Sequence, residues 1–123
     1  MLDHLGLGVT DYERSKAFYE RALEPLGIKF MMEPAPEVGG FGDGLKPYFW
    51  IARRGPAQSG VHVAFATDSR EVVDAFHAAA LDVGGTDNGA PGVREIYHPH
   101  YYGAYVLDPD SNNIEAVCHR PPG

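Results

Sequence analysis

The sequence has one cysteine, few basic residues and no long apolar run, and so lacks the features that disulfide-stabilised, nucleic-acid-binding and membrane-spanning proteins depend on. Cys118 is the only cysteine, so no disulfide can form within the chain. The formal net charge is −7 and the longest basic run is Arg53-Arg54, which disfavours binding to nucleic acid or anionic membranes. No apolar run has membrane length, and the first residues lack the charged and apolar regions of a signal peptide. These absences predict a cytoplasmic protein that binds neither nucleic acid nor membranes.

What is present suits one folded domain over residues 1–123, because 44% of the residues are hydrophobic and 11% are aromatic. The chain also repeats itself: shifted by 58 residues, residues 4–27 align without a gap on residues 62–85. Such a repeat indicates two copies of one structural module. We place the first module at about residues 1–54, a linker at about 55–59 and the second module at about 60–120. The identical positions are His4/His62, Glu13/Glu71, Ala17/Ala75, Phe18/Phe76, Ala22/Ala80, Leu23/Leu81 and Gly27/Gly85.

Each module opens with a strand that carries a histidine. Bulky and small residues alternate through residues 4–9 and again through residues 61–66, which is the pattern of a strand with one covered face. His4 and His62 share their faces with glycine or alanine alone. The small neighbours leave space beside each imidazole, as in the floor of a pocket.

A helix is predicted after each of these strands. Thr10 and Asp68 each precede a glutamate by three positions, which is the spacing of a capping box that begins at these two residues. Apolar stripes follow at helical spacing, and Gly27 and Gly84-Gly85 are suitable helix ends.

Extended segments follow each helix, and turn-forming residues separate them. The fold is therefore predicted to be α+β, with two tandem β-α-β-β-β modules whose mixed sheets form a half-barrel or barrel around a cleft. The segments 34–44, 54–60 and 86–92 are rich in turn formers and are predicted to be loops. The predicted strands are residues 29–33, 46–53, 93–97, 101–107 and 113–119.

Glu115 lies in the middle of the last predicted strand, among apolar residues. A carboxylate in such a place needs a cation or hydrogen-bond donors, because burying an unpaired charge is costly. His4, His62 and Glu115 could satisfy one another by binding one divalent metal ion. Two imidazoles and a carboxylate on one side of an ion leave open positions for substrate or oxygen. The metal-free interpretation of these residues is a hydrogen-bonded remnant of a pocket.

Three motifs carry a resemblance to a known family. They are His4 in the first strand, Gly60-Val61-His62-Val63-Ala64-Phe65, and the segment from Tyr105 to Glu115. With these motifs nearly the whole chain resembles the vicinal oxygen chelate superfamily, which includes glyoxalase I, extradiol dioxygenases, fosfomycin-resistance enzymes and bleomycin-binding proteins. The resemblance implies that His4, His62 and Glu115 occupy three of four metal-ligand positions, and that the ion is Fe²⁺, Zn²⁺, Mn²⁺, Ni²⁺ or Mg²⁺.

The chain departs from the family pattern at two positions. Trp50 stands where glyoxalase I-like enzymes carry a second carboxylate, so the three-ligand set is more similar to that of extradiol dioxygenases. Ser111 stands where the family turn usually has glycine, and Asn112 or Asn113 is expected to take the left-handed conformation instead.

Further site residues follow from the resemblance and from the residue types. Tyr105 matches a tyrosine close to the metal in extradiol dioxygenases, and His100 in a Pro/Gly-rich loop is a second candidate for proton transfer. The expected substrate-binding residues are Trp50, Tyr48, Tyr102 and Arg94.

The resemblance implies a homodimer that acts on a small oxygen-chelating molecule. The reaction would be of the lyase or isomerase type, or a ring-cleaving dioxygenation. The alternative function is a metal-free binding or sequestering protein, similar to bleomycin-resistance proteins, with an aromatic cleft across the dimer.

Overall fold

The computed structural model describes residues 1–122, and it contains the two tandem modules that the repeat predicts. Each module has a strand, a helix and three further strands, so the α+β prediction is confirmed. In residues 1–122 no helix combines the length and the apolar character needed to cross a membrane. The elements are β1 (Leu5–Gly8), α1 (Tyr12–Ala22), η1 (Glu24–Leu26), β2 (Lys29–Ala35), β3 (Val38–Gly42), β4 (Phe49–Ala52), β5 (His62–Ala66), α2 (Arg70–Asp82), β6 (Thr86–Val93), β7 (Tyr102–Leu107) and β8 (Asn113–Cys118).

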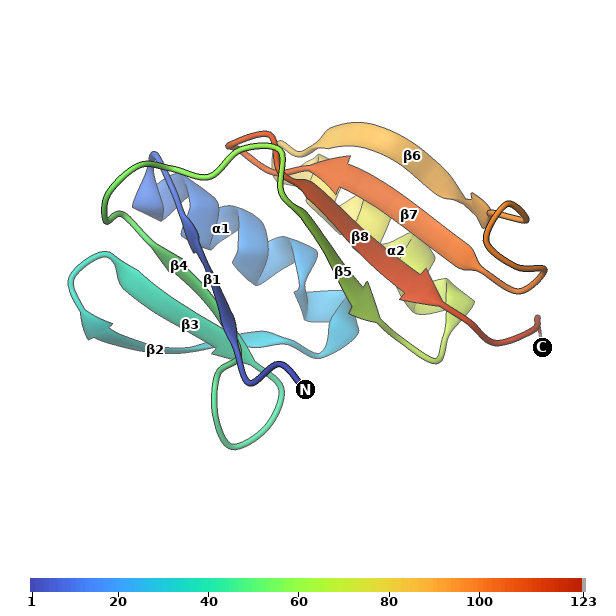
Figure 1. The fold of residues 1–123 in the computed structure, drawn as a ribbon, viewed down its shortest axis with the longest axis horizontal. Coiled ribbons are helices and arrows are strands. Elements are labelled where there is room, and N and C mark those ends of the chain that lie inside the picture. Colours follow the sequence, from blue (N-terminus) through green and yellow to red (C-terminus); the bar gives the residue numbers. More distant parts are fainter. Residues whose placement is uncertain (123) are drawn as a thin grey trace.

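The two modules form separate four-stranded mixed sheets with the same topology. The strand orders are β1-β4-β3-β2 and β5-β8-β7-β6, and in each sheet the first strand runs parallel to the last. The sheets do not close into a barrel, and their arrangement is consistent with a half-barrel. Figure 1 shows α1 and α2 on the same side of the two sheets, which leaves the opposite faces free of helices. We call these opposite faces the open faces.

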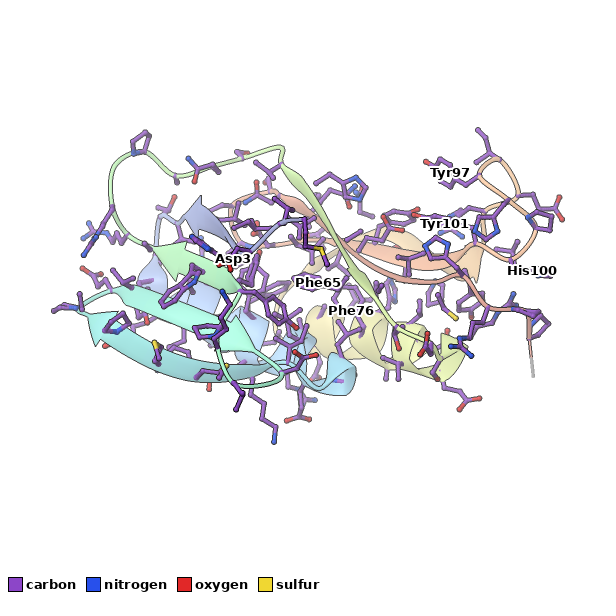
Figure 2. All side chains as sticks on the ribbon, turned by 60° about the horizontal axis from the view of Figure 1, so that its bottom comes forward. Asp3, Phe65, Phe76, Tyr97, His100 and Tyr101 are labelled. Atoms are coloured by element: carbon purple, nitrogen blue, oxygen red, sulfur yellow. The ribbon has the colours of Figure 1, made fainter. Side chains whose placement is uncertain are left out.

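Alternation along the strands decides which side chains reach the core. Val63 and Phe65 of β5 are buried, whereas His62, Ala64 and Ala66 between them are exposed. The core continues from one module to the other, because the Phe49 and Phe65 rings lie 5.4 Å apart between centroids. Figure 2 places Phe65 near the middle of the molecule. The predicted small-residue face around His62 is thus an open face.

Both helices begin one residue later than the capping-box spacing predicts. Asp11, not Thr10, caps α1 and accepts a hydrogen bond from the Arg14 amide. Ser69, not Asp68, caps α2 and accepts from the Val72 amide. The reason is that threonine, aspartate and serine all cap helices, so the spacing to a glutamate does not decide between adjacent candidates.

Two strands occupy segments that were predicted to be loops. In β3, Gly39 and Gly40 are packing positions, because a Cβ on Gly40 would lie 2.8 Å from the Trp50 ring. In β6, Pro91 is tolerated because β6 is an edge strand with register shifts. The predicted strand at 93–97 was wrong: β6 ends at Val93, and a compact loop follows it, closed by a 2.7 Å hydrogen bond from the Arg94 amide to the Tyr101 carbonyl.

The turn before β8 also differs from the expectation. Ser111 itself takes the left-handed conformation, with φ of 67°. The Asp108 carboxylate holds this turn by accepting hydrogen bonds from the Asp110 and Asn112 amides, both at 2.9 Å. The turn geometry is therefore imposed by the Asp108 carboxylate and not by a residue that favours positive φ.

Candidate functional site

Glu115 lies at the centre of the open face of the second sheet. It pairs in register with Ala64 of β5 on one side and with Tyr105 of β7 on the other. Its side chain is 1% exposed, so the carboxylate must be satisfied by protein groups or by a ligand. One oxygen, Oε1, lies 2.8 Å from Nε2 of His62, and the other, Oε2, accepts a hydrogen bond from the Tyr101 hydroxyl.

His62 connects this buried carboxylate to solvent. Its side chain is 52% exposed, although its Nε2 contacts Glu115. The exposure follows from its position at the start of β5, beside Ala64 on the same face, where no bulky side chain covers the ring. A ligand arriving at the open face therefore meets the His62 imidazole, with the Glu115 carboxylate buried behind it.

Two tyrosines adjoin the pair, and both remain neutral well into the alkaline range. Burial, followed by the hydrogen bond to Glu115, raises the pKa of Tyr101 strongly. Burial also raises the pKa of Tyr105, with the Glu115 charge adding to the effect. Gly103 makes room for this cluster, because a Cβ there would lie 3.1 Å from Glu115 Oε2 and 3.2 Å from Tyr101 Cε1.

Arg94 adds a positive charge beside the same cluster. Its guanidinium lies 5.3 Å from the centroid of the Tyr105 ring and donates a 2.7 Å hydrogen bond to the Ala90 carbonyl. The Tyr105 ring also lies near the His62 ring, at 6.2 Å between centroids. Arg94, Tyr105 and His62 are thus neighbouring side chains whose chemistry suits an anionic or oxygen-rich small molecule.

His4, the third predicted metal ligand, lies elsewhere. Its Nδ1 is 2.7 Å from Oδ1 of Asp3, and Lys46 and then His4 lower the pKa of Asp3 through their hydrogen bonds. His4 lines a cavity of about 390 Å³ between the modules, and the lining residues of this cavity do not include His62 or Glu115. Figure 2 shows Asp3 well apart from Tyr101 along the molecule. Within residues 1–122 of one chain, no three His, Cys, Asp or Glu side chains are arranged to hold a metal ion.

The other predicted site residues are distributed over several places. Tyr48 lines the same cavity as His4, and burial together with Asp43 raises the pKa of Tyr48 to about 12. Trp50 packs over Gly40 in the first sheet. Tyr102 faces α2, where its hydroxyl donates to Asp74 at 2.6 Å.

His100 is exposed in the loop before β7, and its backbone amide donates to His98. Among the hydrogen bonds of the described residues, none joins the His100 imidazole to His62 or Glu115.

Tyr101 is the residue of this candidate site that the sequence interpretation missed. It directly precedes β7, yet it follows the alternation of that strand, in which residues 101, 103 and 105 share a face. The alternation was the signal that could have placed Tyr101 beside Glu115. Tyr105, a predicted site residue, is the direct cross-strand neighbour of Glu115.

Comparisons with known proteins agree with this architecture. The chain matches the model of the glyoxalase/bleomycin resistance protein/dioxygenase superfamily over residues 1–116. A glyoxalase/bleomycin resistance protein from Albidiferax ferrireducens is 36% identical, with 97% of this chain and 98% of that chain covered and a TM-score of 0.81. No curated protein matches significantly.

More distant structures share the fold alone. A glyoxalase/bleomycin resistance protein/dioxygenase family enzyme from Burkholderia phytofirmans is 20% identical, with a TM-score of 0.75 over 97% of this chain and 98% of that chain. TioX from Micromonospora is 12% identical, with a TM-score of 0.73 over 98% and 99%. The match to the family model and the relative from Albidiferax ferrireducens identify the chain as a member of the glyoxalase/bleomycin resistance protein/dioxygenase superfamily.

Proposed function

We propose that the protein is a divalent-metal-dependent enzyme whose site is shared between two copies of the chain. His62 and Glu115 of one copy and His4 of the other would hold the ion. The observation that carries the proposal is the buried Glu115 carboxylate, which contacts the half-exposed His62 imidazole at 2.8 Å on an open face. An ion-pairing role alone would not require one member to be buried and the other open to solvent.

The donor set fits a first-row divalent metal. One imidazole nitrogen and one carboxylate oxygen converge, and this mixture suits Fe²⁺, Zn²⁺, Mn²⁺ or Ni²⁺ better than Mg²⁺, which prefers oxygen. His4 is 60% exposed and belongs to the other module, so a second copy is the simplest source of the third donor. A symmetric dimer would then contain two equal sites.

The ion would polarise substrate oxygens and stabilise negative charge that develops on them. The residues of the chain would bind and orient the substrate. Arg94 offers guanidinium donors to an anionic group, and Tyr105 offers a ring face and a neutral hydroxyl beside it. Tyr101 holds the Glu115 carboxylate in place. These features support a small oxygen-chelating substrate, in a lyase, isomerase or ring-cleaving dioxygenase reaction.

A metal-free binding protein is the second candidate. It is favoured by Trp50, which stands at the fourth ligand position of the family, and by the separation of His4 from Glu115 in one chain. In that function, the aromatic rings of the open faces would bind the ligand, and the protein would catalyse no reaction.

Metal titration separates the two functions. Calorimetry with Mn²⁺, Zn²⁺ and anaerobic Fe²⁺ should show about one ion per chain. His62→Ala and Glu115→Gln should weaken binding by more than about 100-fold, because even groups behind metal ligands contribute 10–100-fold. His77→Ala is the matched control, since His77 forms another histidine–carboxylate pair, with Asp87 at 2.9 Å. Equal ligand affinity in His62→Ala and after chelation would favour the binding protein.

Complementation tests whether the site is shared. His4→Ala and Glu115→Gln should each lack metal when pure. If the chains are mixed as unfolded protein and refolded together, about a quarter of the sites should recover, because each mixed dimer holds one intact site. A site within one chain would recover none. Oxygen uptake with a panel of catechols and Fe²⁺ then distinguishes the dioxygenase from the lyase or isomerase.

A further inference from the structure

Two histidines next to the site contact each other and connect a loop to the end of β8. Nε2 of His98 is 2.8 Å from Nδ1 of His119, with an angle of 27° between the ring planes. His98 belongs to the loop of residues 94–101 that joins β6 to β7, and His119 directly follows β8. Figure 2 shows Tyr97, His100 and Tyr101 of this loop together at one end of the molecule. The pair therefore fastens the loop to the strand that carries Glu115.

The hydrogen bonds of this pair define where the protons lie. The His100 backbone amide donates to Nδ1 of His98 at 3.0 Å, so that nitrogen carries no proton. Neutral His98 must then carry its proton on Nε2 and donate it to Nδ1 of His119. Neutral His119 in turn carries its proton on Nε2. Each ring thus uses its single acceptor nitrogen to hold the loop closed.

The Tyr101 ring packs against the two histidines and against Tyr97. Its ring lies 4.7 Å from Tyr97, 5.6 Å from His98 and 5.2 Å from His119, measured between centroids. We call Tyr97, His98 and His119 the aromatic clamp. The hydroxyl of Tyr101 extends from the clamp to Glu115 Oε2. Contacts with these three rings and a hydrogen bond to the carboxylate thus restrict the orientation of Tyr101.

We propose that His98 and His119 are positioning residues that act through Tyr101 on the Glu115 carboxylate. With Oε2 occupied by Tyr101, Oε1 stays directed to His62 and to whatever His62 binds. When the clamp opens, Tyr101 loses its fixed orientation and the carboxylate gains rotational freedom. The consequence for metal binding rests on the proposed function, whereas the hydrogen-bond chain itself does not.

Nuclear magnetic resonance tests the hydrogen-bond chain directly. Long-range proton–nitrogen spectra, recorded at about pH 8 where imidazole is ordinarily neutral, report the tautomer of each ring. Both His98 and His119 should carry the proton on Nε2. A proton on Nδ1 of either ring would overturn the proposed geometry. The experiment requires no metal and no substrate.

A double-mutant cycle tests whether the pair acts through Tyr101. His119→Ala should shift the Nε2 resonance of His62 and weaken Mn²⁺ binding several-fold, up to about tenfold. His119→Asn, whose amide oxygen can accept from His98, should restore part of both. In the Tyr101→Phe background, His119→Ala should have no further effect. His77→Ala and thermal melting control for general destabilisation.

The outcomes are distinguishable from those of the proposed function. Additive effects of His119→Ala and Tyr101→Phe on the His62 resonance would overturn the positioning role. If the wild-type protein binds no metal while the His62 resonance still moves through Tyr101, the proposed enzyme fails and the positioning role stands.

Discussion

Tyr101 and Glu115 lie 14 residues apart in the chain, and the Tyr101 hydroxyl donates a hydrogen bond to Oε2 of the Glu115 carboxylate. The donor comes from the loop before β7, whereas the acceptor lies in the middle of β8. The bond therefore couples an exposed connection to the most buried charged side chain of the open face.

Removing the Tyr101 hydroxyl should destabilise the protein. Tyr101→Phe leaves Glu115 Oε2 buried without its donor, and hydrogen bonds to charged groups contribute about 1.5–3 kcal/mol. Urea unfolding at pH 7 should show a loss of this size. Tyr97→Phe is the matched control, because the Tyr97 side chain is exposed and its ring contact with Tyr101 is kept. Equal stability of the two variants would contradict the role of the hydroxyl.

The Tyr101 hydroxyl should also make the free energy of unfolding decrease at alkaline pH. Burial and the hydrogen bond to Glu115 raise the pKa of Tyr101 above the usual value, so the folded protein keeps this proton longer than the unfolded chain. This contribution is fully present below about pH 10 and declines above it, by at most roughly 1.4 kcal/mol per pH unit for one group.

Urea unfolding at several pH values between about 9 and 11.5 measures the decline. Tyr101→Phe should show a shallower decline than the wild-type protein. An absorbance titration of the folded variant should also lack one late-ionising tyrosine. Identical slopes would show that Tyr101 ionises alike in the folded and unfolded states.

Gly103 should not accept a methyl group. A Cβ there would lie 3.1 Å from Glu115 Oε2 and 3.2 Å from Tyr101 Cε1, both inside ordinary contact distance. Gly103→Ala should therefore cost about 1–3 kcal/mol, the usual range for overpacking, and should displace Tyr101 from Glu115.

Gly44→Ala provides the comparison for Gly103→Ala. A Cβ on Gly44 would meet no heavy atom within 4 Å among the residues that the structure describes. Thermal melting should show this variant as stable as the wild-type protein or slightly more so. If Gly103→Ala melts like Gly44→Ala, the space around Glu115 is larger than the contacts indicate.

Ser111 should gain stability when replaced by glycine. Its φ of 67° costs a residue with a side chain about 1–2 kcal/mol, whereas glycine adopts it freely. The greater flexibility of glycine in the unfolded chain offsets about 0.4–1 kcal/mol of this gain. Chemical denaturation of Ser111→Gly should therefore show a net increase of up to about 1.6 kcal/mol.

Ser59→Gly is the control for Ser111→Gly. In residues 1–122 the non-glycine residues with positive φ are Glu37 and Ser111, so Ser59 gains nothing from glycine. A stability loss in Ser111→Gly would mean that the hydroxyl stabilises the turn.

Local patterns predicted much of this fold, because they depend on neighbours along the chain. Alternation predicted the face of His62, because the bulky Val63 and Phe65 of the same strand pack in the core. It also placed Glu115 on the face opposite the buried Ile114 and Ala116. Helix starts were predicted to within one residue. The loop prediction for β3 failed because its glycines indicate close packing against Trp50, which lies in another strand.

The sequence by itself determined the two modules, the strand and helix that open each of them, and the strand faces of His62 and Glu115. Only the tertiary structure decided which candidates meet. It brings Tyr101 and His62 to Glu115, and it leaves His4 beside Asp3 in the other module. The physical reason is that backbone periodicity sets the face of a strand on which a side chain lies. Contact between side chains of different strands depends instead on strand register and on module packing, and neighbouring residues in the chain do not encode these.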